Sequence, residues 1–126
     1  MTDSALVTGA SRGIGLGIAT RLAQLGYALT VTARDANRLG EIAGHLRREG
    51  AADVHVVAAD LADPATPEAL VGGHEAEFGT MRALILNAGV GTAGPIAELP
   101  ARRFDKTVAV NLTAPVAVLQ AALPLL

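Results

Sequence analysis

Short apolar runs alternate with longer segments of helical period along the whole of this 126-residue chain. The runs that predict buried strands are Ala5–Val7, Ala28–Thr32, Val54–Ala58 and Ala83–Leu86. Each is followed by a segment in which apolar residues recur every three or four positions, as they do in an amphipathic helix. No low-complexity tract or linker interrupts this alternation. The pattern therefore predicts one βα-repeating domain over residues 1–126.

The first two helical segments have clear start and stop signals. A helix from about Ile14 is expected to end at Gly26, and a second to begin at Asp35 and end at Gly50, because glycine is favoured just past a helix and aspartate just before one. The apolar stripes expected to face the sheet are Ile14, Ile18, Leu22 and Leu25 in the first helix, and Leu39, Ile42 and Leu46 in the second.

Two further helices are expected. The third begins at Asp63 or Thr66, since each precedes a proline that suits the first helical position, and it ends at Gly79. It would place Leu70, His74 and Phe78 on one face. The fourth is expected over residues 101–123. Its residues expected to face the sheet are Phe104, Val108, Leu112, Val116, Leu119 and Leu123.

Parallel strands joined by right-handed crossovers give the expected strand order 3-2-1-4, an α/β, Rossmann-like, doubly wound parallel sheet. The carboxyl ends of strands 1 and 4 would flank a cleft. The fourth strand would be an apolar edge, and no fifth strand follows the fourth helix. We therefore expect this chain to be a single dinucleotide-binding domain, truncated at its C-terminus before the later strands.

Composition and charge narrow the function classes. The net charge is -2, and basic residues cluster only as the pairs Arg47-Arg48 and Arg102-Arg103, so nucleic acid is not an expected partner. The absence of cysteine excludes disulfides and thiolate chemistry and agrees with a cytoplasmic location. The three histidines have no acid at metal-ligand spacing, so no metal is expected.

Neither an export signal nor a membrane helix is expected. Asp3 stands where a signal peptide would carry Lys or Arg. The longest weakly polar run, residues 114–126, contains two prolines and is shorter than the roughly 20 residues that span a bilayer.

The segment Thr8–Gly15 (TGASRGIG) lies between the first strand and the first helix and has the properties of a phosphate cradle. Its glycines allow the backbone to approach a ligand, and the following helix directs its unpaired N–H groups and positive dipole end toward it. Gly15 is followed by Leu16-Gly17 rather than by Lys-Ser or Lys-Thr, which excludes a P-loop NTPase. A turn with a purely structural role is the alternative.

This turn, together with Asp60-Leu61, Asn87-Ala88-Gly89 and Asn111, resembles the short-chain dehydrogenase/reductase family over the whole chain. The resemblance implies that the turn binds the cofactor pyrophosphate, that Asp60-Leu61 contacts the adenine, and that residues 87–89 line the cofactor side of the cleft. The cofactor-binding residues expected on this basis are Gly9, Ser11, Arg12, Gly13, Ile14, Gly15, Arg34, Asp60, Leu61, Asn87, Ala88 and Gly89. A solvated turn acid is an equal alternative for Asp60.

The end of the second strand indicates the cofactor. Ala33 occupies the place where an acid would bind the ribose 2'-hydroxyl, and Arg34 follows it. Arg34 and Arg12 suit a 2'-phosphate, so NADP(H) is favoured over NAD(H). The alternative is that Arg34 pairs only with Asp35 or with solvent.

Asn111 and Pro115 predict an interruption of the fourth helix. Proline at 115 has no N–H for the carbonyl of Asn111, so the helix should kink there and leave that carbonyl unpaired. The resemblance implies that this asparagine holds a water in the proton relay of the catalytic lysine.

The proton-donating residues of the family are not found in this chain. The family uses a serine and a Tyr-x-x-x-Lys pair, whereas Tyr27 is followed four residues later by Val31, and the one lysine is Lys106. The first hypothesis is the cofactor-binding part of an NADP-dependent oxidoreductase that moves a hydride between NADPH and a small carbonyl or alcohol substrate. The resemblance also implies a homo-oligomer, because the fourth helix resembles one that family members use to pair subunits. The alternatives are a catalytically inactive dinucleotide-binding or protein-interaction module and, less favoured, a methyltransferase-like domain.

Overall fold

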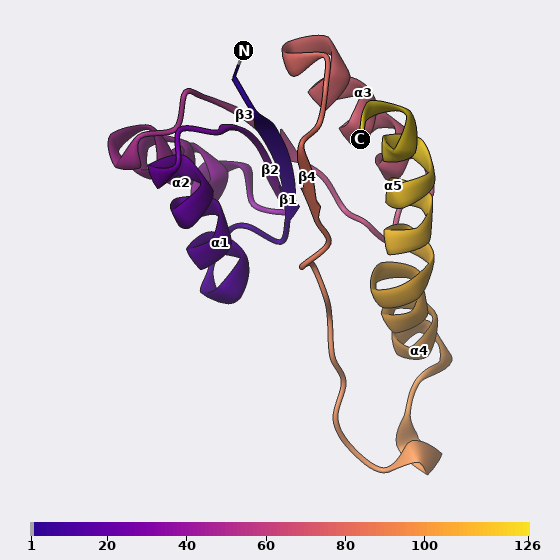
Figure 1. Ribbon diagram of the computed structural model, residues 1–126. Helices are drawn as coiled ribbons and strands as arrows, with labels where there is room; N and C mark the ends of the chain where they lie inside the picture. Colours follow the sequence, from indigo (N-terminus) through magenta and orange to yellow (C-terminus); the bar gives the residue numbers. More distant parts are fainter. Residues whose placement is uncertain (1) are drawn as a thin grey trace.

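The computed structural model describes residues 2–126 as one parallel sheet with helices on both faces (Figure 1). The strand order is β3-β2-β1-β4, as the sequence predicts. The strands are β1 (Ser4–Thr8), β2 (Ala28–Ala33), β3 (Asp53–Ala58) and β4 (Ala83–Ile85). Helices α1 (Gly13–Gln24) and α2 (Ala36–Glu49) cover one face, and α3 (Thr66–Phe78) and α5 (Ala114–Ala122) cover the other.

Side chains on β1 alternate between two apolar cores, one on each face of the sheet. Ala5 and Val7 belong to the core under α1 and α2, whereas Leu6 belongs to the core under α3 and α5. All three are fully buried, as expected for a strand with both faces covered. The predicted inner face of α3 is confirmed at Leu70 and His74, which are fully buried, while Phe78 is half-buried.

The predicted ends of α2 are confirmed. The Asp35 carboxylate accepts hydrogen bonds from the main-chain N–H groups of Asn37 (3.0 Å) and Arg38 (3.2 Å), and Gly50 closes the helix with φ 117°. Helix α1 has no side-chain cap and no acidic residue in its first turn. Its amino end is therefore left without the polar partners that α2 has.

The predicted inner stripe of α1 is partly wrong. Its buried face consists of Gly15, Ala19 and Ala23, while Ile14 is 76% exposed and Leu25 is also exposed. Small residues at every fourth position let α1 approach the sheet closely, and larger apolar residues are displaced to its flanks.

The predicted inner stripe of the last helical segment is also wrong. Its buried residues are Val110, Ala114, Val118 and Ala122. The predicted residues Phe104, Leu112, Val116, Leu119 and Leu123 are exposed, and Val108 is half-buried. The helix is apolar on two faces, and the face with the smaller side chains permits the close packing of α5 on α3.

The last helical segment is continuous and confirms the helix predicted over residues 101–123, so it is longer than the run 114–126 on which the membrane argument rested. It runs through α4 (Ala101–Val108), a π-helical turn at Ala109–Thr113 and α5 to a final 3₁₀ turn at Leu123–Leu125. Its 25 residues have a mean hydropathy of 1.7 and are long and apolar enough to cross a membrane by length and composition alone. In this structure its inner face packs on α3 and contributes to the core.

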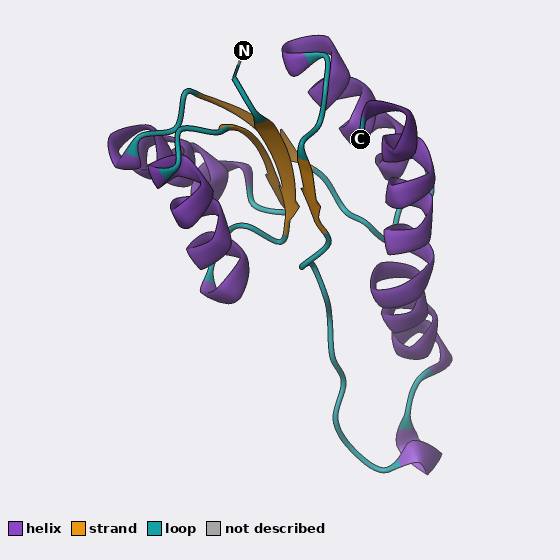
Figure 2. Cartoon of the chain, in the orientation of Figure 1, coloured by secondary structure: helices purple, strands orange, loops and turns teal. Residues whose placement is uncertain are grey.

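The connection between β4 and α4 is the longest loop of the fold. Figure 2 shows it running away from the sheet, through a short 3₁₀ turn at Ile96–Glu98, before the chain returns in α4. The residues 91–98 of this loop are exposed. The loop therefore depends on contacts at its two ends for its position.

Candidate functional site at the carboxyl ends of the strands

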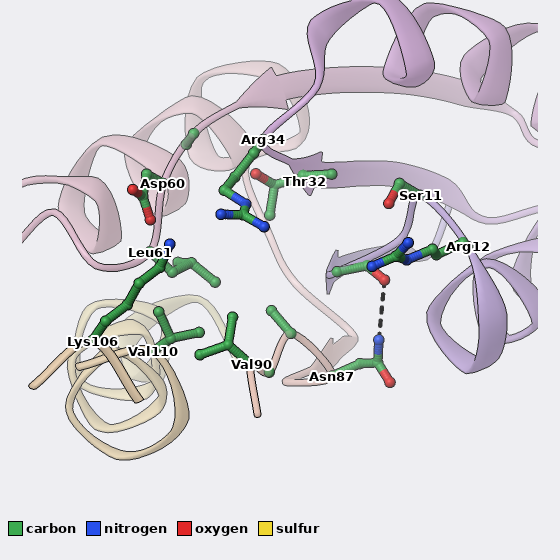
Figure 3. Close-up of a pocket in the computed structure, with 15 residues that line it drawn as sticks. Ser11, Arg12, Thr32, Arg34, Asp60, Leu61, Asn87, Val90, Lys106 and Val110 are labelled. Carbon is green, nitrogen blue, oxygen red and sulfur yellow. Dashed lines mark hydrogen bonds between the residues drawn. The ribbon is translucent and has the colours of Figure 1, made fainter. Parts of the chain in front are cut away.

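A cleft of about 240 Å³ opens at the carboxyl ends of the strands (Figure 3). The segments that follow β1, β2, β3 and β4 all contribute to it, and α4 and the π-helical turn close one side. The residues lining it are Gly9, Ser11, Arg12, Thr32, Ala33, Arg34, Ala59, Asp60, Leu61, Asn87, Ala88, Gly89, Val90, Lys106 and Val110. The cleft thus lies where ligands bind in open α/β sheets.

Glycine is required in the turn after β1 because of close backbone contacts. Gly9 has φ 65°, and a Cβ there would lie 2.7 Å from the Cα of Ala88. A Cβ at Gly15 would collide with the carbonyl oxygen of Gly9 and with Nδ2 of Asn87. Gly13 has φ 57°, and no other group lies within 4 Å of where its Cβ would be. The turn is therefore packed against the β4 loop on one side and open on the other.

Hydrogen bonds join this turn to the loop after β4. Asn87 Nδ2 donates to the carbonyl of Gly9 at 3.0 Å, which is the dashed line in Figure 3. The main-chain N–H groups of Asn87 and Ala88 donate to Thr8 Oγ1 at 3.1 and 3.0 Å. These three hydrogen bonds join the two loops that flank the cleft.

Asn111 lies outside the cleft lining and holds the β4 loop from the other side. Its Oδ1 accepts from the main-chain N–H of Val90 at 2.8 Å, and its Nδ2 donates to the carbonyl of Val90 at 2.6 Å. The predicted helix interruption occurs as a π-helical turn, in which the N–H of Ala114 donates to the carbonyl of Ala109. The unpaired main-chain carbonyl of Asn111 stays a prediction.

The rim of the cleft carries three cations and one acid, Arg12, Arg34, Lys106 and Asp60. Within residues 2–126, no carboxylate lies within 4.0 Å of the charged groups of these three cations. The alternative in which Arg34 pairs with Asp35 is therefore not found, since that carboxylate caps α2 instead. The positive charge of the rim is available to an anionic ligand.

Asp60 has a structural contact as well as a place in the cleft. Its Oδ1 accepts from the N–H of Ala62 at 2.9 Å, and its main-chain carbonyl accepts from Thr66 Oγ1 at 2.7 Å. One oxygen of the Asp60 carboxylate therefore stabilises the turn after β3, as the turn-acid alternative predicts.

The structure brings most of the predicted site residues together. Gly13, Ile14 and Gly15 form the amino end of α1 and do not line the cleft, and neither does Asn111. Sequence reasoning missed Thr32, Ala59, Val90, Lys106 and Val110 as lining residues. Lys106 and Val110 are one helical turn apart, just before Asn111 in the same helix. Their helical spacing places them on one face, and this spacing is a sequence signal that could have identified both as lining residues.

The cradle fits an anionic dinucleotide. An open glycine at φ 57°, an uncapped helix start and arginines with no carboxylate within 4.0 Å among residues 2–126 are the groups that hold phosphates in such sites. Among the described residues 2–126, no cluster of three His, Asp or Glu side chains could hold a metal ion. Fold and site together define a dinucleotide-binding α/β domain of the Rossmann class.

Comparison with known proteins defines the family. The family described as short chain dehydrogenase matches residues 3–126. The chain belongs to this family of oxidoreductases.

The chain resembles proteins that are named as reductases or oxidoreductases, and it spans about half of their length. It is 43% identical over 109 residues to a ketoacyl reductase assigned to the granaticin polyketide synthase of Streptomyces violaceoruber, covering 86% of this chain and 40% of the relative. A metagenomic short-chain oxidoreductase in complex with NADP superposes with a TM-score of 0.91 at 37% identity, covering 97% of this chain and 55% of the other.

A third protein resembles the chain as closely but binds the other cofactor. The 3-oxoacyl-[acyl-carrier protein] reductase of Brucella melitensis, in complex with NAD, superposes with a TM-score of 0.89 at 37% identity. The match covers 99% of this chain and 49% of the other. The comparisons therefore leave the choice between NADP and NAD to the residues of this chain, and they lend no support to a catalytically inactive module.

Proposed function

We propose that this chain is the cofactor-binding part of an NADP-dependent oxidoreductase that interconverts a small carbonyl compound and an alcohol. The observation that carries the cofactor choice is the pair of arginines on the cleft rim, Arg12 and Arg34, neither of which has a carboxylate within 4.0 Å among residues 2–126. Ala33 stands where an acid would repel a 2'-phosphate. The bound cofactor would supply the two-electron chemistry.

Each residue is proposed to contact the part of the cofactor that lies nearest to it. The pyrophosphate lies against the turn and the start of α1, formed by Gly9, Ser11, Gly13, Ile14 and Gly15. The 2'-phosphate is held by Arg12 and Arg34, and the adenine lies against Asp60 and Leu61. Asn87, Ala88 and Gly89 line the path toward the reacting end, and Asn111 positions that path through Val90.

The proposed reaction needs groups that these 126 residues do not contain. The chain has no Tyr-x-x-x-Lys sequence and no serine beyond Ser11. We propose that the proton donor, the substrate oxygen site and the substrate pocket belong to the remainder of a longer protein. In that protein Asn111 would act as a relay residue rather than as the proton donor.

We also propose that the protein is a homo-oligomer. The outer face of α4 and α5 exposes Phe104 (55%), Leu112 (63%) and Leu119 (41%). Exposed apolar side chains gathered on one face are typical of a surface that another protein covers.

Direct binding measurements on the full-length protein test the cofactor choice. Arg34→Leu should weaken NADPH binding about tenfold or more, because a charge-assisted hydrogen bond contributes about 1.5 to 3 kcal/mol, and should leave the Kd for NADH nearly unchanged. Arg48→Leu is the matched control, since Arg48 is exposed at the far end of α2 and does not line the cleft. Tighter binding of NADH than of NADPH by the unsubstituted protein would contradict the proposal.

A further inference from the structure

Lys106 reaches the cleft from a different direction than the two arginines. Figure 3 shows its side chain extending from α4 toward Asp60 and Leu61, while Arg34 enters from the opposite side. Among these 126 residues it is the one lysine. The family's catalytic lysine lies four residues after a tyrosine, whereas position 102 is an arginine, so Lys106 has no part in that pair.

Two neighbouring contacts place the helix that carries the exposed side chain of Lys106. Val110, one helical turn further along, lines the same cleft and is 5% exposed. Asn111 then anchors the helix to the β4 loop through its two hydrogen bonds to Val90, at 2.8 and 2.6 Å. The helix face that carries Lys106 is therefore held toward the Asp60–Leu61 end of the cleft.

The charge of Lys106 is not used within the part of the chain that the structure describes. No carboxylate lies within 4.0 Å of its ammonium group in residues 2–126, although Asp60 lines the same cleft. An ammonium group beside an aromatic ring that is partly desolvated is attracted to the face of that ring. Its long aliphatic stem can also cover an apolar surface.

We propose that Lys106 is a determinant of cofactor affinity that contacts the adenine ring, lying over it from the α4 side. This inference rests on the proposed function, which places the adenine against Asp60 and Leu61. The lysine acts on the part that NADPH and NADH share, whereas Arg34 acts on the 2'-phosphate that only NADPH has. Substitution of Lys106 should therefore weaken the binding of both cofactors, whereas substitution of Arg34 should weaken the binding of NADPH alone.

Binding of both cofactors to the full-length protein, without any substrate, separates these patterns. Lys106→Met keeps most of the stem and removes the charge, and it should raise the Kd of NADPH and of NADH by the same factor, about two- to fivefold. Lys106→Arg should retain most of the affinity. Arg102→Met is the matched control, because Arg102 is an exposed cation on the same helix that does not line the cleft, and it should change neither Kd.

Protection from amine modification is a second, independent readout. Acetylation of Lys106 by acetic anhydride can be followed by mass spectrometry of its peptide. Saturating 5'-AMP should slow this acetylation severalfold, and nicotinamide mononucleotide should not, because only the former contains adenine.

The possible failures are distinguishable. Unchanged Kd values for both cofactors in Lys106→Met, a loss confined to NADPH, or equal acetylation with and without 5'-AMP would each overturn the role of Lys106 while leaving the proposed function intact. Failure of the unsubstituted protein to bind either dinucleotide would overturn the proposed function, and this inference with it.

Discussion

At the scale of single residues, His74 shows how a buried polar side chain is satisfied. Its Nδ1 lies 2.8 Å from Thr30 Oγ1, and its Nε2 lies 2.9 Å from the carbonyl of Thr80 and 3.2 Å from Ser4 Oγ. A carbonyl only accepts, so Nε2 carries the proton and Nδ1 accepts from the Thr30 hydroxyl. Burial lowers the pKa of His74 below its ordinary value of 6.5, against the raising effect of the Thr80 carbonyl.

His74 therefore makes stability depend on pH. Below about pH 6.5 the unfolded chain binds a proton at this histidine that the folded chain resists, so the free energy of unfolding should fall as the pH decreases from 7 toward 5. Urea unfolding at both pH values, on the native protein and on His74→Gln, measures this contribution. The substituted protein should be less stable at pH 7 and should lose less stability on acidification. Equal losses in the two proteins would contradict the prediction.

The glycines of α1 give a matched pair of substitutions. Gly15→Ala places a Cβ against the Gly9 carbonyl and Asn87, which are groups that hold the cleft together, whereas a Cβ at Gly17 meets nothing within 4 Å. Gly15→Ala should destabilise the protein by about 1 to 3 kcal/mol and weaken dinucleotide binding. Gly17→Ala should stabilise it by up to about 1 kcal/mol, since alanine is the better helix former. Thermal unfolding and cofactor titration measure both, and equal effects would show that Gly15 is not in close contact.

At the scale of elements, the helical segment from α4 to α5 positions the long loop after β4. Among residues 2–126, the side-chain hydrogen bonds that join this segment to the loop are the two between Asn111 and Val90. The same helix supplies Lys106 and Val110 to the cleft. A change at Asn111 should therefore alter the loop and the cleft wall together.

Two substitutions separate these hydrogen bonds. Asn111→Asp retains the acceptor for the Val90 N–H and loses the donor to its carbonyl, whereas Asn111→Ala loses both. Hydrogen exchange of the Val90 amide should be fastest in Asn111→Ala and little changed in Asn111→Asp. Gln120→Ala, at an exposed position of α5, is the control and should leave this exchange unchanged. Slow exchange in all three proteins would mean that other contacts hold the loop.

At the scale of the whole molecule, the outer face of α4 and α5 carries a row of exposed apolar side chains. Leu112, Val116, Leu119 and Leu123 are all more than 40% exposed along one helical segment. Leu119→Lys should weaken the proposed homo-oligomer at least tenfold, because burying a leucine contributes about 1.5 to 3 kcal/mol. Sedimentation velocity over a concentration series measures it.

A control on the opposite side of the sheet adds the same charge. Gly40→Lys introduces a lysine on α2, where a Cβ meets nothing within 4 Å, and should not change the oligomeric state. A monomeric unsubstituted protein, or equal sedimentation of the two variants, would contradict the proposed interface.

Local patterns account for the part of the fold that was predicted. The strand order, the caps of α2 and the glycine turn depend on residue types at short range, such as Asp35 before a helix and Gly50 after it. The predicted site residues after each strand meet because the carboxyl ends of parallel strands share one edge. The family match covers residues 3–126, a range that contains these motifs.

What the sequence by itself determined is thus the order of elements, the glycine-rich turn after β1 and the residues that follow each strand, since each depends on near neighbours in the chain. Only the tertiary structure decided which face of α5 is buried, because that helix is apolar on two faces and the choice depends on how closely it can approach α3. It also decided that Asn111 binds Val90, since these two residues lie on either side of a long loop of no regular period.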